Sequence, residues 1–155
     1  SDGPEGIDFV ARNLRRVVPS GARQTIRGVT LAAASVELYA WGLVVLVAIE
    51  YPGQPMLING PDDWSIIDDR GSQYRCFNWA GSGQRLHAGR SGWRLDLMFA
   101  PAVDPAARRL TLAVDGVKLR YSGDVPAPYL SSHRDGLVRL AGLWELAIDL
   151  TPHQG

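Results

Sequence analysis

The sequence has 155 residues, and its 16 Lys and Arg balance its 16 Asp and Glu, so its formal net charge is +0. A chain of this length is expected to fold as one domain over residues 1–155. Without a net positive charge, it is not expected to bind nucleic acid or an acidic membrane surface. Hydrophobic residues make up 46% and charged residues 21%, which is typical of a folded globular chain rather than a disordered one.

Cysteine content and hydropathy exclude two further classes. Cys76 is the only cysteine, so the chain cannot be a disulfide-stabilised scaffold. The longest unbroken apolar run, residues 43–49, is much shorter than the roughly 20 residues of a transmembrane helix. Residues 1–18 lack the basic start, apolar run and cleavage site of a signal peptide. We therefore expect no transmembrane segment and no signal peptide within these residues, although a signal peptide that had been removed would leave no trace in them.

The first half of the chain reads as a series of strands. Residues 7–18 fit a short amphipathic helix or a first strand, and a strand is favoured for residues 14–18. Residues 25–39 predict one or two strands, although their alanine run leaves the register open. Residues 43–51 are apolar on both alternating faces, which predicts a central strand covered on both sides.

A turn signal lies in the stretch SIIDDRGSQYRCFNW, residues 65–79. An Asp at the head of a turn bonds the backbone two residues on, and Gly71 can supply the positive φ of a tight turn. Asp68, Asp69, Arg70 and Gly71 therefore predict a hairpin with a solvated acidic turn, followed by a strand that begins near Tyr74.

The second half continues the alternation of strands and turns. The glycine-rich segment 80–92 reads as a mobile hairpin loop, and residues 93–99 as a strand with one wet face. Residues 105–108 fit a single helical turn. Asp115 and Gly116 separate two alternating runs, so residues 110–114 and 117–121 are predicted to pair as a hairpin through a two-residue turn.

The last segment contains one irregular region. Its two prolines predict that residues 122–142 cross the surface, with a short helix within residues 132–142. Residues 144–150 alternate as a last strand. About eight or nine short strands without a strong helix predict an all-β fold, an antiparallel immunoglobulin-like β-sandwich.

At this level of pattern, residues 27–114 resemble bacterial telokin-like, immunoglobulin-like β-sandwich domains. The resemblance rests on an acidic turn of the D-D-x-G-x-x-Y type, on a strand that ends in Phe and Pro, and on a following basic L-x-L strand. These residues are Asp68, Asp69, Gly71, Tyr74, Phe99, Pro101 and Leu110. Such domains are mostly envelope or extracellular modules of unknown function, so the resemblance implies a fold and favours that location. The residues themselves leave the compartment open, and the tryptophan-rich middle and residues 122–142 depart from the pattern.

The candidate metal ligands are few. Calcium takes six to eight oxygen ligands, but the aspartates do not follow an EF-hand spacing, so a solvated acidic rim is favoured over a calcium site. These aspartates are Asp62, Asp63, Asp68 and Asp69. Cys76 and His87 are soft ligands, but structural zinc needs four ligands, and His133 and His153 lie far away in the sequence. We expect no metal and no cofactor, and we interpret Cys76 as a buried or half-buried strand residue.

Catalytic motifs are also missing from the sequence. It contains no G-x-S-x-G elbow and no G-x-x-x-x-G-K phosphate loop. A paired-carboxylate hydrolase would need Asp68 to face Glu50 or Asp96 across a cleft, which spacing cannot show. The chain is therefore expected not to be an enzyme, and a small hydrolase is the third of three hypotheses.

The favoured hypothesis is a binding face formed by Tyr74, Phe77 and Trp79 beside the glycine-rich loop. Aromatic side chains in such a position can stack on sugar rings or anchor a protein partner. The alternative is that Trp93 and Phe77 belong to the core and only Trp79 is exposed, and the register of Trp93 favours the core for that residue. The predicted function is a non-catalytic module that binds a protein or a glycan. The second hypothesis is a structural module that forms homo-oligomers through an open sheet edge.

Overall fold

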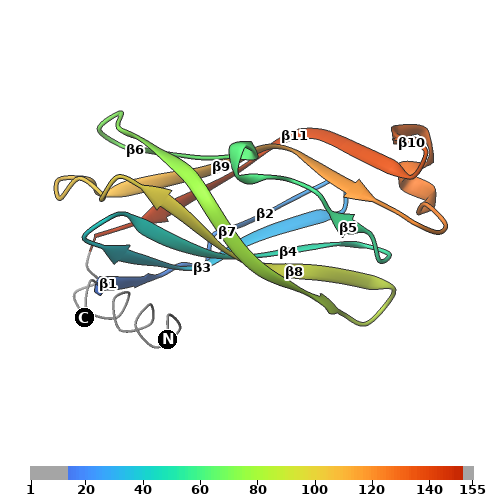
Figure 1. Cartoon of the computed structure of the whole chain (residues 1–155), viewed down its shortest axis with the longest axis horizontal. Coiled ribbons are helices and arrows are strands. Elements are labelled where there is room, and N and C mark those ends of the chain that lie inside the picture. The colour runs from blue at the N-terminus through green and yellow to red at the C-terminus, as the bar shows by residue number, and fades with distance from the viewer. Residues whose placement is uncertain (1–13, 152–155) are drawn as a thin grey trace, which may run out of the picture.

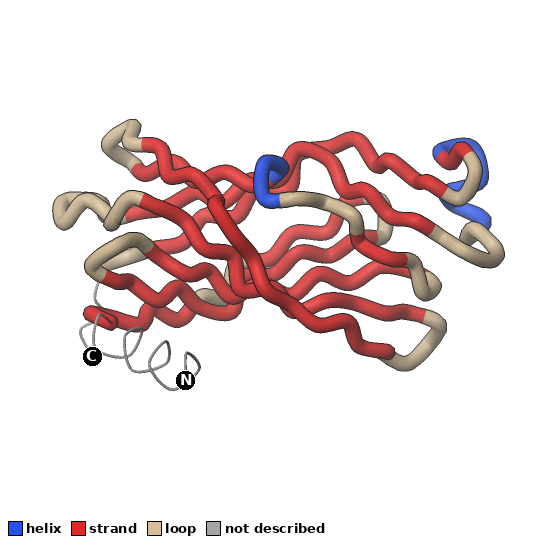
Figure 2. Tube along the Cα trace, viewed as in Figure 1, coloured by secondary structure: helices blue, strands red, loops and turns tan. Residues whose placement is uncertain are grey.

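The computed structural model describes residues 14–151, which form an all-β fold of eleven antiparallel strands. Within that range the only helices are two short 3-10 segments, η1 (Pro61–Asp63) and η2 (Ala127–Ser132) (Figure 2). None of the described helices has the length and apolar character needed to cross a membrane. The all-β prediction is confirmed, but the strand count is eleven rather than eight or nine.

The strands follow one another with short connections, and Figure 1 labels them. They are β1 (Leu14–Pro19), β2 (Arg23–Ile26), β3 (Val29–Tyr39), β4 (Leu43–Pro52), β5 (Met56–Leu57), β6 (Trp64–Asp68), β7 (Gln73–Arg85), β8 (Arg90–Ala100), β9 (Arg109–Arg120), β10 (His133–Arg134) and β11 (Leu137–Asp149). The strand predicted for residues 14–18 is confirmed as β1, while residues 7–13 of that prediction lie outside the described residues.

One hydrogen-bonded path connects the strands in the order β1-β3-β4-β8-β7-β6-β9-β11-β10, with β2 beside β3 and β5 beside β9. The two ends of this path approach each other, because β2 contacts β11. There the Glu145 N–H donates to Gln24 Oε1 at 2.6 Å, and the Trp144 indole N–H donates to the Val29 carbonyl at 3.0 Å. The sheet therefore curls around a single core (Figure 1).

Alternating side chains fill that core. On β8, Leu95, Leu97 and Phe99 are buried as predicted and Trp93 is half-buried. The predicted last strand is confirmed as part of β11, whose Trp144 is fully buried. Each such burial contributes about 1.5–3 kcal/mol. Strand β4 lies between β3 and β8 as a central strand, but its outer face is only partly covered.

The hairpin predicted at Asp115 and Gly116 is wrong, because β9 runs unbroken through both residues. Pairing with β11 along its whole length overrides the local turn preference. Gly116 keeps a positive φ of 95° at the place where β9 passes from β6 to β5. Asn59 fills the gap between those strands: its amide donates to the Gly116 carbonyl at 3.0 Å and accepts from the Lys118 N–H at 2.8 Å.

Two predicted helical segments are also wrong. Residues 105–108 form a turn, in which the Ala107 N–H donates to the Asp104 carbonyl at 2.9 Å. Residues 133–142 belong to β10, β11 and their tight connection, and the only helical residues nearby are those of η2. Pairing of β11 with β9 again outweighs local preference.

The glycine-rich segment 80–92 is mostly strand rather than loop. Strand β7 continues to Arg85, which leaves residues 86–89 as the connection to β8. Gly81 is required there, because a Cβ would lie 2.6 Å from the Arg94 carbonyl oxygen. A Cβ on Gly83 would lie 3.3 Å from the Trp93 ring. These glycines allow close packing against β8 rather than marking a loop.

The role of Asn59 can be tested by Asn59→Ala. This substitution leaves the Gly116 carbonyl and the Lys118 N–H without their side-chain partner, and we expect a loss of about 1–3 kcal/mol in the free energy of unfolding. Urea denaturation measures it. Gln84→Ala, which changes an exposed amide side chain on β7, is the control and should stay within about 0.5 kcal/mol of wild type. Equal effects of the two substitutions would contradict the role of Asn59.

Candidate functional site

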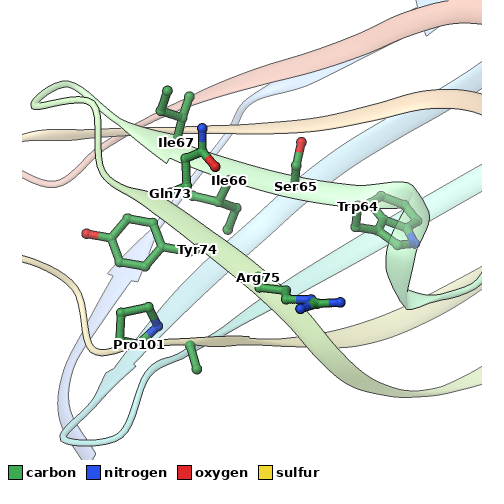
Figure 3. A pocket seen from close by; sticks show the side chains of 9 residues that line it. Trp64, Ser65, Ile66, Ile67, Gln73, Tyr74, Arg75 and Pro101 are labelled. Carbon is green, nitrogen blue, oxygen red and sulfur yellow. The ribbon is translucent and has the colours of Figure 1, made fainter.

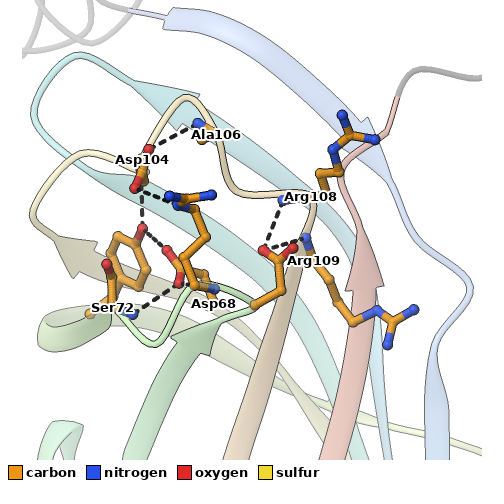
Figure 4. Close-up of polar contacts among 9 residues, drawn as sticks. Asp68, Ser72, Asp104, Ala106, Arg108 and Arg109 are labelled. Carbon is orange, nitrogen blue, oxygen red and sulfur yellow. Dashed lines mark hydrogen bonds and ion pairs between the residues drawn. The ribbon is translucent and has the colours of Figure 1, made fainter.

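The acidic turn joins β6 to β7, and Asp68 organises it (Figure 4). Asp68 Oδ1 accepts the N–H groups of Arg70 and Ser72, both at 2.9 Å, while Oδ2 accepts the Tyr74 hydroxyl at 2.7 Å. Gly71 has a φ of 88°, as a tight turn requires. The predicted hairpin is confirmed, but the turn is not fully solvated as predicted, because Asp68 is buried and both of its carboxylate oxygens accept hydrogen bonds within the hairpin.

The turn also fastens two distant segments. The Tyr74 hydroxyl accepts the Asp104 N–H at 3.0 Å. Asp69 Oδ1 accepts the N–H groups of Arg108 and Arg109 at 2.9 and 3.3 Å (Figure 4). The two aspartates therefore tie the start of β9 and the connection after β8 to the β6–β7 hairpin.

The titration behaviour of these groups agrees with a structural role. Burial opposes ionisation of Asp68, but hydrogen bonds from Tyr74, Ser72 and Arg70 outweigh it, so the pKa of Asp68 lies below its usual value. Hydrogen bonding from the Arg108 N–H lowers the pKa of Asp69. Burial and the bond to Asp68 raise the pKa of Tyr74 to about 12. Neither carboxyl has the raised pKa of a general acid.

The structure separates the predicted metal ligands. Asp63 accepts the Gly60 N–H at 2.9 Å and lies 3.2 Å from Lys118 Nζ, so it caps η1 instead of joining Asp68. Cys76 is a buried strand residue, as predicted, and burial raises the pKa of its thiol to about 11. Within residues 14–151, no group of three or more His, Cys, Asp or Glu side chains could hold a metal ion. His153 lies outside that range.

The carboxylate pairs considered for a hydrolase are separated in the same way. Asp68 pairs with Leu110 of β9, whereas Asp96 pairs with Leu46 of β4. Glu50 lies on β4 opposite Gly92. Strands β7 and β8 separate β6 from β4, and β7 separates β6 from β8, so neither Glu50 nor Asp96 lies on a strand next to that of Asp68.

The structure does not bring Tyr74, Phe77 and Trp79 onto one face. Tyr74 is buried, Phe77 is 53% exposed, and Trp79 is half-buried with its ring edge-on to Trp93 at 6.1 Å. The cause is a β-bulge between Cys76 and Asn78, which interrupts the alternation. Trp79 and Trp93 pack against the core, and Phe77 faces outward.

Phe77 belongs instead to a row of three aromatic side chains that sequence reasoning missed. Tyr39 stacks on Trp41 with ring centroids 5.0 Å apart, and Trp41 meets Phe77 edge-on at 5.9 Å. The Trp41 Nε1–H is shielded from solvent and has no acceptor among the described residues. We call Tyr39, Trp41 and Phe77 the aromatic row. The two aromatics in the turn YAWG were a local signal, but Phe77 joins them only through the order of the strands.

A groove of about 680 Å³ lies between β6, β7 and the end of β8 (Figure 3). We call it the β6–β7 groove. Ile67, which is 44% exposed, and the exposed Arg75 both line it. Its lining residues are Trp64, Ser65, Ile66, Ile67, Gln73, Tyr74, Arg75, Ala100 and Pro101. Arg75 pairs with Ala100, which lies against Gly42 of the Trp41 turn, so the groove adjoins the aromatic row.

Comparison with known proteins gives a fold and no function. No protein-family model matches the sequence, and no curated protein matches it. A solved structure described as the conserved domain protein from Bacillus anthracis is similar, with a TM-score of 0.55 and 15% sequence identity. The match covers 88% of this chain and 49% of that chain, so this chain spans about half the length of that structure. At this identity the similarity shows the fold alone.

The acidic turn makes stability depend on pH. Because the pKa of Asp68 is lowered by folding, its ionisation stabilises the protein above the ordinary Asp pKa of about 4, and that contribution is lost as the pH falls through the folded pKa. We expect Asp68→Asn to unfold more easily at pH 7 by about 1–3 kcal/mol and to lose less stability below about pH 4. Urea denaturation over a pH series measures both. Asp62→Asn, an exposed control, should keep the wild-type slope, and equal slopes for Asp68→Asn and wild type would contradict this role.

The same geometry predicts the response to calcium. Asp68 and Asp69 already accept backbone N–H groups, so a cation would have to displace those bonds. We expect the thermal midpoint of unfolding to be equal in calcium and in chelator. A rise in calcium that Asp68→Asn abolishes would show that this turn is a metal site.

Proposed function

We propose that the protein is a non-catalytic binding module whose ligand lies over the aromatic row and the adjoining β6–β7 groove. The exposure of Phe77 carries this proposal. A phenylalanine that is 53% exposed on a β-strand, in edge-on contact with Trp41, costs hydration free energy in the free protein. A partner that covered it would recover that cost.

The indole of Trp41 supports the same location. Its Nε1 is the one solvent-shielded side-chain nitrogen or oxygen without a hydrogen-bond partner among the described residues. Leaving such a donor unpaired costs about 1–3 kcal/mol, and native folds contain few such groups. The unpaired donor lies beside the exposed Phe77, so the two unfavourable features coincide.

A protein ligand fits this surface better than a glycan. Sugars stack on a flat, exposed aromatic face, but Tyr39 covers one face of Trp41 at 5.0 Å with nearly parallel rings. The groove beside the row combines the apolar Ile67 with the exposed Arg75. An apolar peptide segment that carries a carboxylate would match that combination.

A hydrolase is less well supported, because the groove offers no free acid. Both carboxylate oxygens of Asp68 accept hydrogen bonds within the turn, and Asp96 lies on β8 opposite Leu46 of β4. Catalytic pairs need one carboxyl available to substrate and held at a raised pKa.

We also propose that the fold belongs with immunoglobulin-like β-sandwiches of the telokin-like kind, which would favour an extracellular or envelope location. The support is the acidic turn, in which the Tyr of the D-D-x-G-x-x-Y pattern bonds its first Asp. Against a simple sandwich, β6 pairs with both β7 and β9 and so joins the two halves into one sheet.

The binding face can be tested by selecting peptides from a displayed random library on the wild-type protein. We expect selected peptides to lose about tenfold or more in affinity for Phe77→Ser, because a buried aromatic anchor contributes much of the binding free energy. Val17→Ser is the matched control, since Val17 is 52% exposed on β1. Isothermal titration calorimetry of synthetic peptides measures the three affinities.

A panel of soluble polysaccharides completes the experiment. A thermal shift with a polysaccharide that Phe77→Ser abolishes would assign the face to a glycan instead of a protein. Peptides that bind Phe77→Ser and wild type equally well would contradict the proposed face.

A further inference from the structure

Strand β7 has a neighbour on one side only for much of its length. Residues 73–75 pair with β6, and Arg75 to Arg85 pair with β8. After Arg75 the hairpin pairing ends, because Trp64 is the only residue of β6 beyond that pair and the helix η1 precedes it, while β7 continues along β8 (Figure 1). Within residues 14–151, no strand pairs with the other side of residues 78–85.

The hydrogen-bond pattern between β7 and β8 determines the direction in which the N–H and C=O groups of β7 point. The Leu86 N–H donates to the Arg90 carbonyl at 3.0 Å. In an antiparallel pair every second residue bonds to the neighbouring strand, so every second residue before Leu86 also bonds to β8. Those residues are Gln84, Ser82, Ala80 and Asn78. The N–H and C=O groups of Trp79, Gly81, Gly83 and Arg85 therefore point away from β8. The Trp79 N–H agrees, because it donates to the Asn78 side chain at 2.9 Å.

The outer edge of residues 80–85 has little of the usual protection, although η1 contacts β7 and a bulge interrupts β7 between Cys76 and Asn78. Proteins blunt edge strands with lysines, prolines, bulges or very short strands. Residues 80–85 are all exposed, and alanine, serine and glycine occupy the first four of these positions. The other edges differ: β5 and β10 have two residues each, and Gln24 bridges β2 to β11. The six-residue edge strand β1 contains Arg15 and Arg16 and ends at Pro19.

We infer that this edge binds the same edge of a second copy of the chain, antiparallel, about a two-fold axis at Ser82. In this register Trp79 lies opposite Arg85 of the second copy, and Gly81 opposite Gly83. It is the register that pairs all four outward-facing residues, and each pair exchanges both of its backbone hydrogen bonds.

The side chains are complementary in that register. Ser82 meets Ser82 of the second copy, and small residues around it allow close approach of the strands. The Arg85 guanidinium comes opposite the Trp79 indole, which favours a cation–π contact. No like charges face each other across the edge, and a formal net charge of +0 means that two copies do not repel.

The size of the contact sets the expected affinity. A paired edge of seven residues buries less than the roughly 1,200 Å² of a standard stable interface. We therefore expect a weak dimer whose population rises with concentration. The inference is independent of the proposed ligand-binding face, because Trp41 and Phe77 do not lie on this edge.

The test introduces a positive or a negative charge at Ser82, an exposed residue. Sedimentation velocity over about 10 μM to about 1 mM should show a concentration-dependent dimer of the wild-type protein. Ser82→Lys and Ser82→Asp each place like charges opposite each other at the axis, so each should weaken the dimer by about tenfold or more. An equimolar mixture of the two variants should restore it.

Controls separate this edge from other causes. Ala80→Lys adds the same charge on the same exposed strand, but opposite the neutral Gln84 of the second copy, and should still dimerise. Phe77→Ser should also dimerise, which distinguishes failure of this inference from failure of the binding face. Within one copy, Ser82 pairs with Arg94, whose positive charge favours Asp over Lys at position 82. Restored dimerisation in the mixture would show that the loss in each variant comes from charge repulsion between copies and not from this local effect.

Three results would overturn the inference. They are a wild-type protein that stays monomeric over the whole range, association that survives Ser82→Lys unchanged, and an equimolar mixture that stays monomeric. A monomer whose β7 amides become protected only on adding an extended peptide would assign the edge to a strand of another protein instead.

Discussion

The N–H and C=O groups of a buried, extended backbone need hydrogen-bond partners on both sides of the strand, and this requirement organises the whole fold. Where a neighbouring strand is missing, a side chain takes its place. Asn59 bonds β9 in the gap between β5 and β6, Asp69 holds the start of β9, and Gln24 bridges β2 to β11. Polar residues that look available for chemistry in the sequence are therefore committed to the backbone.

Strand β7 differs, because along much of its outer edge neither a strand nor a side chain of residues 14–151 bonds its backbone. Residues 73–75 pair with β6, Arg75 also pairs with β8, and from Cys76 onward β8 is the paired neighbour. Among the described residues, no side chain bonds the outward groups of Gly81 and Gly83. The same strand carries Phe77, whose exposure supports the proposed ligand face. One strand thus offers two surfaces: an outward aromatic face near the acidic turn, and a bare backbone edge toward the connection with β8.

Sequence patterns predicted those features that depend on neighbouring residues. The alternation of β8 and β11 and the turn at Asp68 are local, and all three are confirmed. The turn predicted at Asp115 and Gly116 is wrong, because the pairing of β9 with β11 is long-range and outweighs the local turn preference. The predicted aromatic face does not form, because a bulge after Cys76 interrupts the alternation of side chains along β7. The contact of Trp41 with Phe77 could not be predicted, because it depends on which strands lie side by side.

Residue-resolved amide hydrogen exchange of the dilute protein, followed by NMR, tests this account most directly. We expect alternation along β7: the Ala80 and Ser82 amides, bonded to β8, exchange slowly, and the Gly81 and Gly83 amides exchange quickly. Equal protection of both pairs at low concentration would contradict it, because the edge would then be covered within a single chain.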